Sequence, residues 1–241
     1  MDKIKAKISY IYHSGFAIET QNYFLVFDYY KEPGLSKESS LLPSLLSSKN
    51  TNKKVFIFSS HNHEDHFNPL ILDWENYNPE IIYILSEDIK TVIKKSNYIF
   101  MKEGDVKEIN NLHIKAFGST DIGISFLVKV DDITIYHAGD LNWWHWKEDS
   151  LEEQKIAELN FKVQIDKLKK EENIDIAFFP VDPRLAEFYY IGAQYFAQVL
   201  HPGLLIPMHF ADNLSITKQF SQRMKKLNIK AAEINFPGHE I

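Results

Sequence analysis

Hydrophobic residues in the first third of the chain come in short runs of β-branched and aromatic side chains, separated by turn residues such as Gly15 and Gln21-Asn22. Runs of five or six such residues favour strands over helices. A shorter, fully apolar run before residue 59 predicts a buried strand. The strands predicted in this third are residues 7–12, 16–20, 23–27 and 55–58.

The rest of the chain alternates between strand-like runs and segments of helical composition. The longest helical segment, residues 151–172, is rich in helix formers and contains no Gly or Pro. The Asp131-Asp132 pair predicts a hairpin turn. The further predicted strands are residues 81–85, 112–117, 124–130, 133–137, 176–179, 204–206 and 230–234. The predicted helices are residues 68–76, 86–96, 151–172, 192–200 and 215–227.

Two strand-rich blocks, each followed by helices, predict an α+β fold in which two sheets pack on each other with helices outside. The length of 241 residues and the 44% of hydrophobic residues suffice for one large core. No segment has the composition of a linker, so we expect a single domain over residues 1–241.

The composition limits the chemistry that a site can use. There is no cysteine, which excludes disulfides, thiolate nucleophiles and metal sites built on sulfur. Ten histidines are present, and three of them lie within residues 61–66. Any metal ion in this protein must therefore be bound by nitrogen and oxygen.

The charge balance argues against nucleic acid as a partner, because the formal net charge is −6. The net charge does not exclude a local basic patch. The first residues lack the uninterrupted apolar segment of a secretory signal, and no stretch approaches the ~20 apolar residues of a membrane span. We expect a cytoplasmic protein that acts on a small-molecule substrate and has no membrane partner.

The strongest chemical signal is the segment His61-Asn62-His63-Glu64-Asp65-His66, which follows the predicted strand 55–58. His61 and His63 stand two residues apart, so on an extended backbone they point to one side, as two ligands of one ion require. Asp65 and His66 follow within a tight turn and could serve a second ion about 3.5–4 Å away. A solvated polar loop is the alternative, and it explains this density of ligand-type side chains less well.

The pattern His61-x-His63-x-Asp65-His66 resembles the HxHxDH motif of the metallo-β-lactamase-fold hydrolases. His137-Ala138-Gly139-Asp140 is similar to the family's HxGD element, and Pro207-Met208-His209-Phe210 to the element that carries its last histidine ligand. The Gly15 turn and Asp28 at a strand end also match. The resemblance spans roughly residues 5 to 236 and is nearest to the small, lactonase-like branch that acts on sugar acids.

This resemblance implies a four-layer αββα sandwich of two mixed β-sheets with helices on the outer faces. It also implies a binuclear site for one or two divalent ions, with zinc expected and manganese or iron as alternatives. The ligands it implies are His61, His63, Asp65, His66, Asp140 and His209, with Asp140 bridging both ions. Asp65 is further expected to act in catalysis, as acceptor of the proton of the attacking water.

The sequence departs from the family at one ligand. The family places a further histidine between the HxHxDH motif and the bridging aspartate, whereas this chain has Ala116 to Gly123 there, without histidine. Thr120 or Asp121 occupies the position. A carboxylate is a competent ligand for zinc, manganese or iron, so Asp121 could replace the imidazole. It could equally cap a turn.

Three further residues are candidates for binding substrate. His13 stands at a strand end that faces the metal pocket in similar proteins, although a surface histidine is as consistent with the sequence. Trp143 begins the cluster Trp143-Trp144-His145-Trp146 and could line a pocket, or it could pack beneath the long helix. Arg184 follows the predicted strand 176–179 and suits carboxylate or phosphate, or it forms a surface ion pair, with Asp182 as a partner.

The function expected from these residues is that of an enzyme. It would be a metal-dependent hydrolase that uses an activated water on a small ester, a lactone or a phosphodiester-like substrate. Two alternatives stay open: a metal-dependent nuclease, and a member of the fold that has lost catalysis and only binds metal or ligand. The acidity of the chain and the lack of room for a large inserted domain argue against the nuclease.

Overall fold

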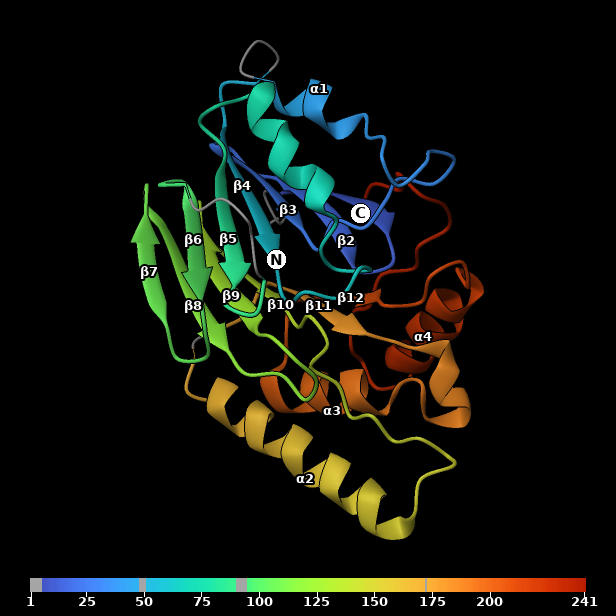
Figure 1. Ribbon diagram of the computed structural model, residues 1–241. Coiled ribbons are helices and arrows are strands. Elements are labelled where there is room, and N and C mark those ends of the chain that lie inside the picture. Colours follow the sequence, from blue (N-terminus) through green and yellow to red (C-terminus); the bar gives the residue numbers. More distant parts are fainter. Residues whose placement is uncertain (1–5, 48–50, 90–94, 172) are drawn as a thin grey trace. The chain divides into compact units, whose positions relative to one another are not determined.

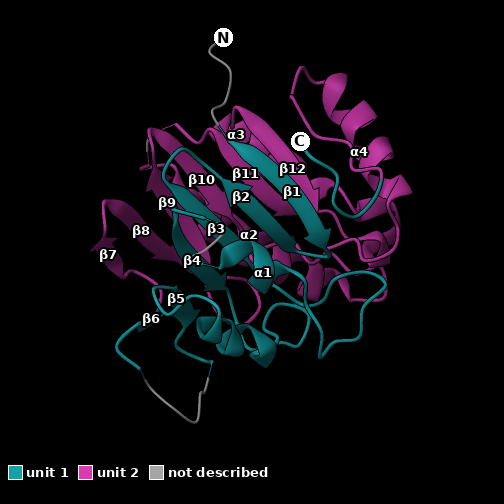
Figure 2. Ribbon diagram, turned by 90° about the horizontal axis from the view of Figure 1, so that it is seen from above, with its two compact units in different colours: residues 1–101, 236–241 teal, residues 102–235 magenta. Residues whose placement is uncertain are grey.

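The computed structural model describes residues 6–47, 51–89, 95–171 and 173–241. The chain divides into two compact units, which Figure 2 shows in different colours. Unit 1 comprises residues 1–101 and 236–241, and unit 2 comprises residues 102–235. This division does not test the prediction of a single domain, which therefore stays a prediction. No helix among the described residues is long and apolar enough to cross a membrane.

Unit 1 contains a six-stranded mixed sheet in which the strands follow one another in sequence order. The first three strands pair antiparallel, and from the third strand on the pairing is parallel. The carboxyl ends of β3 and β4 therefore lie at the same edge of the sheet. The strands are β1 (Lys7–Tyr12), β2 (Gly15–Glu19), β3 (Tyr23–Phe27), β4 (Lys54–Ser59), β5 (Ile82–Ser86) and β6 (Tyr98–Met101).

Two short helical segments belong to unit 1, α1 (Leu42–Leu46) and the 3-10 helix η1 (Pro69–Asn76). Proline at the first position starts η1, and the Asn68 side chain caps it by accepting from Leu70 N. The Tyr83 hydroxyl on β5 donates to Ile71 O of η1 at 2.8 Å. Of the helix predicted over residues 86–96, residues 90–94 lie outside the described residues, and residues 87–88 form a turn.

The last six residues of the chain cover the outer edge of β1. Tyr10 N donates to His239 O at 3.1 Å, and Ile241 N donates to Ile8 O at 2.9 Å. Lys7 and Glu240 form an ion pair at the same edge, with 2.7 Å between Nζ and Oε1. This segment extends the hydrogen bonding of the sheet beyond β1.

Unit 2 contains a second six-stranded mixed sheet, in the order β12-β11-β10-β9-β8-β7. Strands β7 to β10 pair antiparallel, and β10, β11 and β12 pair parallel (Figure 1). The strands are β7 (Val106–Ile109), β8 (Leu112–Phe117), β9 (Ser125–Val130), β10 (Ile133–His137), β11 (Ile176–Pro180) and β12 (Leu204–Met208).

The β9–β10 hairpin confirms the turn predicted at Asp131-Asp132. Both residues have positive φ, 45° and 61°, as the tight turn that suits the twist of a hairpin requires. Asn110 and Asn111 turn the β7–β8 hairpin in the same way, with φ of 52° and 65°. Asp and Asn tolerate this backbone region better than other non-glycine residues.

Helices α2 and α3 pack on one face of the unit 2 sheet. Phe161 of α2 contacts Phe179 of β11 with ring centroids 6.1 Å apart, and Phe196 of α3 stacks on Tyr136 of β10 at 5.3 Å. Figure 1 shows α2 and α3 side by side. The helices of unit 2 are α2 (Leu151–Leu168), α3 (Ile191–Leu200), α4 (Ser215–Lys225) and the 3-10 helix η2 (Pro183–Phe188).

The strand predicted over residues 230–234 is wrong. Only an isolated bridge joins Ala231 to Leu205 of β12. Further along, the backbone N and O of Ile234 both bond to the Thr217 hydroxyl of α4, at 3.0 Å each. Lys230 and Ala232 still bond to Leu205, but at Ile234 the helix takes the hydrogen bonds that a strand would have given to the sheet.

Candidate metal centre

The predicted ligand loop of unit 1 begins directly after β4. His61 is fully buried and His63 is exposed, and their ring nitrogens Nε2 and Nδ1 lie 3.0 Å apart. Asp88, which follows β5, holds this loop because its Oδ2 accepts from Asn62 N at 2.8 Å. The loop then turns back on itself, with His66 N donating to His63 O at 3.0 Å. The structure thus brings His61 and His63 together, as the spacing predicted.

A buried carboxylate orients His66. Asp28 follows β3 and is fully buried, and its Oδ2 lies 2.7 Å from His66 Nδ1. The same carboxylate accepts from Ser60 N and from Ser60 Oγ, each at 2.7 Å. A carboxylate at Nδ1 fixes the tautomer of an imidazole and directs Nε2 as the ligand atom. The parallel pairing of β3 and β4 is what places Asp28 beside this loop.

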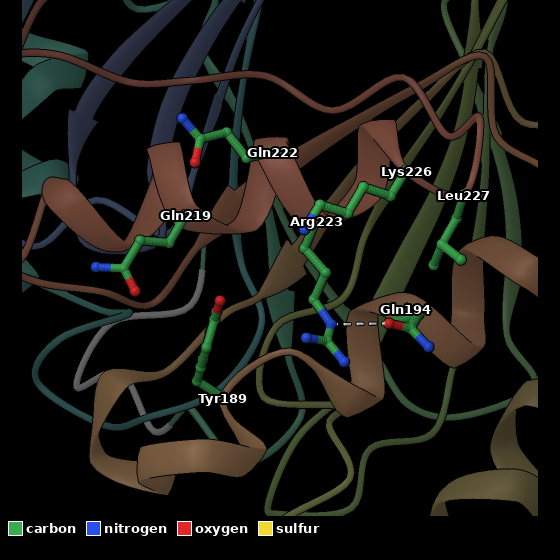
Figure 3. Close-up of a pocket in the computed structure, with 7 residues that line it drawn as sticks. All are labelled: Tyr189, Gln194, Gln219, Gln222, Arg223, Lys226 and Leu227. Atoms are coloured by element: carbon green, nitrogen blue, oxygen red, sulfur yellow. Dashed lines mark hydrogen bonds between the residues drawn. The ribbon is translucent and has the colours of Figure 1, made fainter.

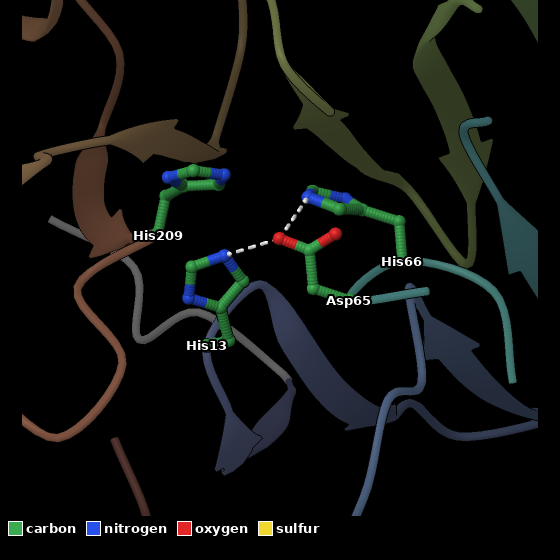
Figure 4. Close-up of side chains that lie close together, drawn as sticks. All are labelled: His13, Asp65, His66 and His209. Atoms are coloured by element: carbon green, nitrogen blue, oxygen red, sulfur yellow. Dashed lines mark ion pairs between the residues drawn. The ribbon is translucent and has the colours of Figure 1, made fainter. Parts of the chain in front are cut away.

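His13 and Asp65 lie next to His66 within unit 1, as Figure 4 shows. His13 Nε2 is 3.2 Å from Asp65 Oδ2, and His66 Nε2 is 3.9 Å from the same oxygen. His13 is only 8% exposed, so it is not a surface histidine. The ligand atoms of these three residues lie within 4.8 Å of one another, the spacing of groups that could share an ion. Figure 4 also draws His209, which belongs to unit 2.

In unit 2 the ligand-type side chains follow the parallel strands. Asp140 comes after β10, Asp182 after β11 and His209 directly after β12. The carboxyl ends of neighbouring parallel strands meet at one edge of a sheet, where α/β proteins commonly bind ligands. Asp140 Oδ1 accordingly lies 3.2 Å from His209 Nε2. Both predicted ligands of this unit are therefore neighbours, although 69 positions separate them in the sequence.

Asp182 orients His209 as Asp28 orients His66. Asp182 Oδ2 lies 3.0 Å from His209 Nδ1, and Arg184 donates from Nε and Nη2 to the same carboxylate. Burial would raise the pKa of Asp182, but the hydrogen bonds from His209 and Arg184 outweigh it and lower that pKa to about 2. Asp182 is thus a carboxylate at neutral pH and keeps the proton of His209 on Nδ1.

Three residues of these clusters have left-handed backbone. The φ angles are 56° for His13, 43° for Asp28 and 64° for His209. Non-glycine residues in this region cost on the order of 1 kcal/mol or more and concentrate at functional sites. Gly15 contributes in another way, because a Cβ there would lie 3.1 Å from Asp28 O. Each carboxylate–histidine pair therefore contains a residue with left-handed backbone, and this conformation sets the direction of its side chain.

Neither residue at the departure from the family pattern has ligand geometry. Asp121 is exposed, and its Oδ1 accepts from Ile122 N at 2.9 Å, so it caps a turn. The Thr120 hydroxyl donates to Asn142 O at 2.7 Å and accepts from Asn142 N at 3.0 Å. Asp121 belongs to no cluster of His, Asp and Glu ligand atoms among the described residues. Thr120 instead fastens the loop that carries Asp140.

The tryptophan cluster divides between two roles. Trp143 stacks on Phe161 of α2 at 6.0 Å and meets Tyr195 of α3 edge-on at 6.2 Å, which is packing beneath the long helix. Trp144 instead contacts the His209 ring edge-on at 5.7 Å. Trp143 as a substrate contact stays a prediction, and Trp144 is the member of the cluster beside a candidate ligand.

Arg184 continues the surface that Trp144 begins. Trp144 stacks on Trp146 with centroids 5.9 Å apart and planes 6° apart, and the Arg184 guanidinium lies 5.7 Å above the Trp146 ring. The Arg184 side chain is 61% exposed, so it both pairs with Asp182 and reaches solvent. Trp144, Trp146 and Arg184 form what we call the aromatic ledge.

Sequence reasoning missed the contacts behind the ligands. Ser60, Asp88 and the bond from Asp182 to His209 were not predicted, although Asp28 was matched by resemblance. The signal that could have found them is their place: each carboxylate follows a strand of a parallel pair. The donor sets themselves, imidazole nitrogens and carboxylate oxygens, are those that divalent zinc, manganese or iron accept.

Comparison with known proteins decides the family. Residues 7–158, more than half of the chain, match the beta-lactamase superfamily domain. The chain belongs to the beta-lactamase superfamily. The matched residues include two of the three motifs noted above, His61 to His66 and His137 to Asp140. A search of curated proteins gives no significant match.

Solved structures match this chain over nearly its whole length. Igni18, described as a metallo hydrolase from Ignicoccus hospitalis, is 17% identical over 98% of this chain and 97% of its own, with a TM-score of 0.70. The metallo-beta-lactamase fold protein YhfI from Bacillus subtilis is 13% identical over 98% of both chains, at 0.61. The predicted fold class, two mixed sheets with helices in an αββα sandwich, is confirmed.

The fold also occurs with another chemistry. CmlA, a diiron β-hydroxylase from Streptomyces venezuelae, is 10% identical over 100% of this chain and 54% of its own, with a TM-score of 0.58. At such identities the likeness concerns the fold alone. The reaction must therefore be argued from this chain's own side chains.

Proposed function

We propose that this protein is a metal-dependent hydrolase whose ligands for one or two divalent ions are His61, His63, Asp65, His66, Asp140 and His209. The single observation that carries the proposal is that His66 and His209 each have Nδ1 held by a buried carboxylate, Asp28 or Asp182. This arrangement serves to prepare Nε2 for a metal ion. Zinc is the ion we expect, since the ligands are nitrogen and oxygen only.

Bound divalent ions would supply Lewis acidity, which lowers the pKa of water and polarises a substrate oxygen. The chain's own contribution to the reaction is proton transfer and positioning. Asp65 is the proton acceptor in this proposal, and His13, 3.2 Å from its Oδ2, orients that oxygen and can take up the proton in turn. A carboxylate tied to a histidine in this way keeps one oxygen directed at one position.

The aromatic ledge supports a small substrate with a negative charge and a flat or apolar portion. The Arg184 side chain is 61% exposed, and a guanidinium at the surface suits a carboxylate or phosphate oxygen. Trp144 and Trp146 offer ring faces beside it. Within the superfamily we propose the lactonase-like branch, with a small ester, lactone or phosphodiester-like bond as the one cleaved.

The test is a panel of generic esters, lactones and bis-p-nitrophenyl phosphate, assayed with added Zn²⁺ or Mn²⁺. We expect hydrolysis of at least one class, and we expect Asp65→Asn to lower kcat by about 100-fold or more. Asp132→Asn, in the β9–β10 turn, is the matched control for loss of one carboxylate and keeps full activity. Circular dichroism and thermal unfolding check that both variants fold.

Three results would contradict the proposal in different ways. Unchanged turnover in Asp65→Asn would remove Asp65 from the chemistry. Metal binding without turnover of any probe would favour a member of the fold that only binds metal or ligand. Cleavage of single-stranded RNA in preference to the small probes would favour the nuclease.

The aromatic ledge has its own test, on whichever probe is cleaved. Arg184→Gln should raise KM for a charged probe by about tenfold and leave KM for an uncharged ester unchanged, because a charged hydrogen bond is lost only with the former. An equal change for both probes would mean that Arg184 acts only through Asp182 and His209.

A further inference from the structure

A pocket of about 430 Å³ lies between α4, the start of α3 and the end of η2, and it shares no residue with the candidate metal centre. This volume is in the range of sites for small molecules. We call it the α4 pocket (Figure 3). Its lining residues are Tyr189, Gln194, Gln219, Gln222, Arg223, Lys226 and Leu227.

The lining has an unusual balance for an acidic protein. Two of the seven residues are cations and three are amides, while none is an aspartate or glutamate. In the part of the chain that the structure describes, Arg223 and Lys226 form no ion pair. The other arginine of the chain, Arg184, is by contrast paired with Asp182. The α4 pocket is therefore a local basic patch on a chain with a net charge of −6.

Arg223 is held in place before any ligand arrives. Its guanidinium carbon lies 3.3 Å above the Tyr190 ring, and its Nε donates to Gln194 Oε1 at 3.2 Å. Figure 3 shows this bond and the Tyr189 hydroxyl pointing toward α4. The stacking and the Nε bond leave the two terminal nitrogens available. An arginine fixed in this way loses little side-chain entropy when an anion binds.

The remaining side chains extend the site along α4. Gln219, Gln222 or Arg223, and Lys226 recur every three or four residues, so they lie on one face of the helix. The positive charge of Arg223 also acts on the Tyr189 hydroxyl, where it opposes the rise that burial causes in the pKa of that tyrosine. Cations and neutral donors are thus presented together.

We propose that the α4 pocket binds a small polar anion. Arg223 and Lys226 bind its carboxylate or phosphate group, and the glutamine amides with the Tyr189 hydroxyl bind its hydroxyl or amide groups. A planar guanidinium with two free nitrogens suits either anion, since both present two oxygens at the right spacing. An extended nucleic acid strand is a poorer fit, because its binding needs a basic stripe and two cations do not make one.

The experiment is isothermal titration of the purified full-length protein with four probes: inorganic phosphate, glycerol 3-phosphate, acetate and succinate. Phosphate and glycerol 3-phosphate test binding of a phosphate group, and acetate and succinate test binding of a carboxylate. Tighter binding of glycerol 3-phosphate than of phosphate would indicate that the glutamine amides bind its hydroxyl groups. We expect one of the two chemistries to bind, and Arg223→Gln to weaken that binding by about tenfold or more. Arg223→Lys should restore only part of it, because lysine keeps the charge and loses the planar fork.

Lys218→Gln is the matched control. Lys218 is an exposed cation of the same helix that does not line the pocket, so its removal changes the net charge equally. Phosphate can also bind divalent ions, so the contrast between Arg223→Gln and Lys218→Gln carries the result. Equal affinities in both variants, or no binding of any probe by the unmodified protein at millimolar concentration, overturn the proposal. Thermal unfolding confirms that Arg223→Gln is folded.

Discussion

Both units hold a histidine by a buried carboxylate, but they build this pair from different material. In unit 1 Asp28 is bonded to His66 and to two groups of Ser60, all of them buried. In unit 2 Asp182 is bonded to His209 and to Arg184, whose side chain is 61% exposed. The first pair is closed off from water, while the second is linked through arginine to the surface. The carboxylate–histidine pair is therefore enclosed by buried partners in unit 1, whereas in unit 2 one of its partners is exposed to solvent.

The largest expected effect distinguishes the two carboxylates. Asp28→Ala removes the buried carboxylate that accepts from Ser60 and lies 2.7 Å from His66 Nδ1, and should lower the free energy of unfolding by about 3 kcal/mol. Asp182→Ala should lower it by about 1–2 kcal/mol, because the exposed Arg184 regains water. Urea unfolding in EDTA measures both without a contribution from metal.

Metal affinity should fall in both variants by about 10- to 100-fold, since each loses the group that orients a ligand. Asp132→Asn serves again as the control. If Asp28→Ala and Asp182→Ala destabilise the protein equally, the distinction between a closed and an open pair is wrong.

The next effect concerns how unit 2 holds Asp140. Gly192 of α3 lies against the loop that follows Asp140. A Cβ at this position would be 2.1 Å from Asn142 Oδ1 and 3.0 Å from Trp143 N. Alanine usually stabilises a helix by up to about 1 kcal/mol over glycine. Here the overlap dominates, and we expect Gly192→Ala to lower the free energy of unfolding by about 2 kcal/mol and to weaken metal binding.

Gln198→Ala, on the exposed side of the same helix, is the matched control and should change neither quantity. A Gly192→Ala protein that is more stable than the original would show that the loop moves away without cost.

The smallest effect separates stability from metal affinity within unit 2. Ser150 and Glu153 form a capping box at the start of α2, so Ser150→Ala should cost about 1 kcal/mol and leave metal affinity unchanged. The hydrogen bonds from Ser150 lower the pKa of Glu153 below its usual 4.5. The stabilisation they give is present above that usual value and is lost as the pH falls through the lowered pKa.

Glu153→Gln keeps the box without a titrating group, so the acid dependence of unfolding should become flatter while the helix remains capped. Thermal unfolding between pH 3 and pH 6, a range of about one to two units around the usual pKa, measures this. An unchanged acid dependence would mean that the pKa of Glu153 is the same in the folded and the unfolded chain, so that its bonds to Ser150 do not stabilise the fold.

The two units also differ in how far their sites could be predicted from the sequence. The unit 1 ligands sit in one loop of six residues after an apolar strand, so spacing alone indicated them. Asp140 and His209 follow separate strands, and only the resemblance joined them. The orienting role of Asp182 depends on the pairing of β11 with β12, a long-range contact that local pattern does not contain.

Two elements of the fold were missed because their local sequence lacks the pattern of a strand or helix. Strand β7 has mostly exposed residues and lies at the edge of its sheet, so it lacks the apolar run that marks a strand. Helix α1 has five residues in a serine-rich stretch and is not among the predicted helices. The sequence left Asp121 open between ligand and cap, and the exposure of its side chain, which favours the cap, is a property of the folded chain.

The last six residues, bonded along β1, have a consequence for how copies of this protein meet. The outer edge of a sheet offers N–H and C=O groups that pair readily with a strand of another molecule. Here that edge is taken by the chain itself, and the Lys7–Glu240 ion pair adds charge to it. Proteolytic loss of the segment would expose the N–H and C=O groups along the edge of β1 and favour pairing with a strand of another molecule, and so aggregation.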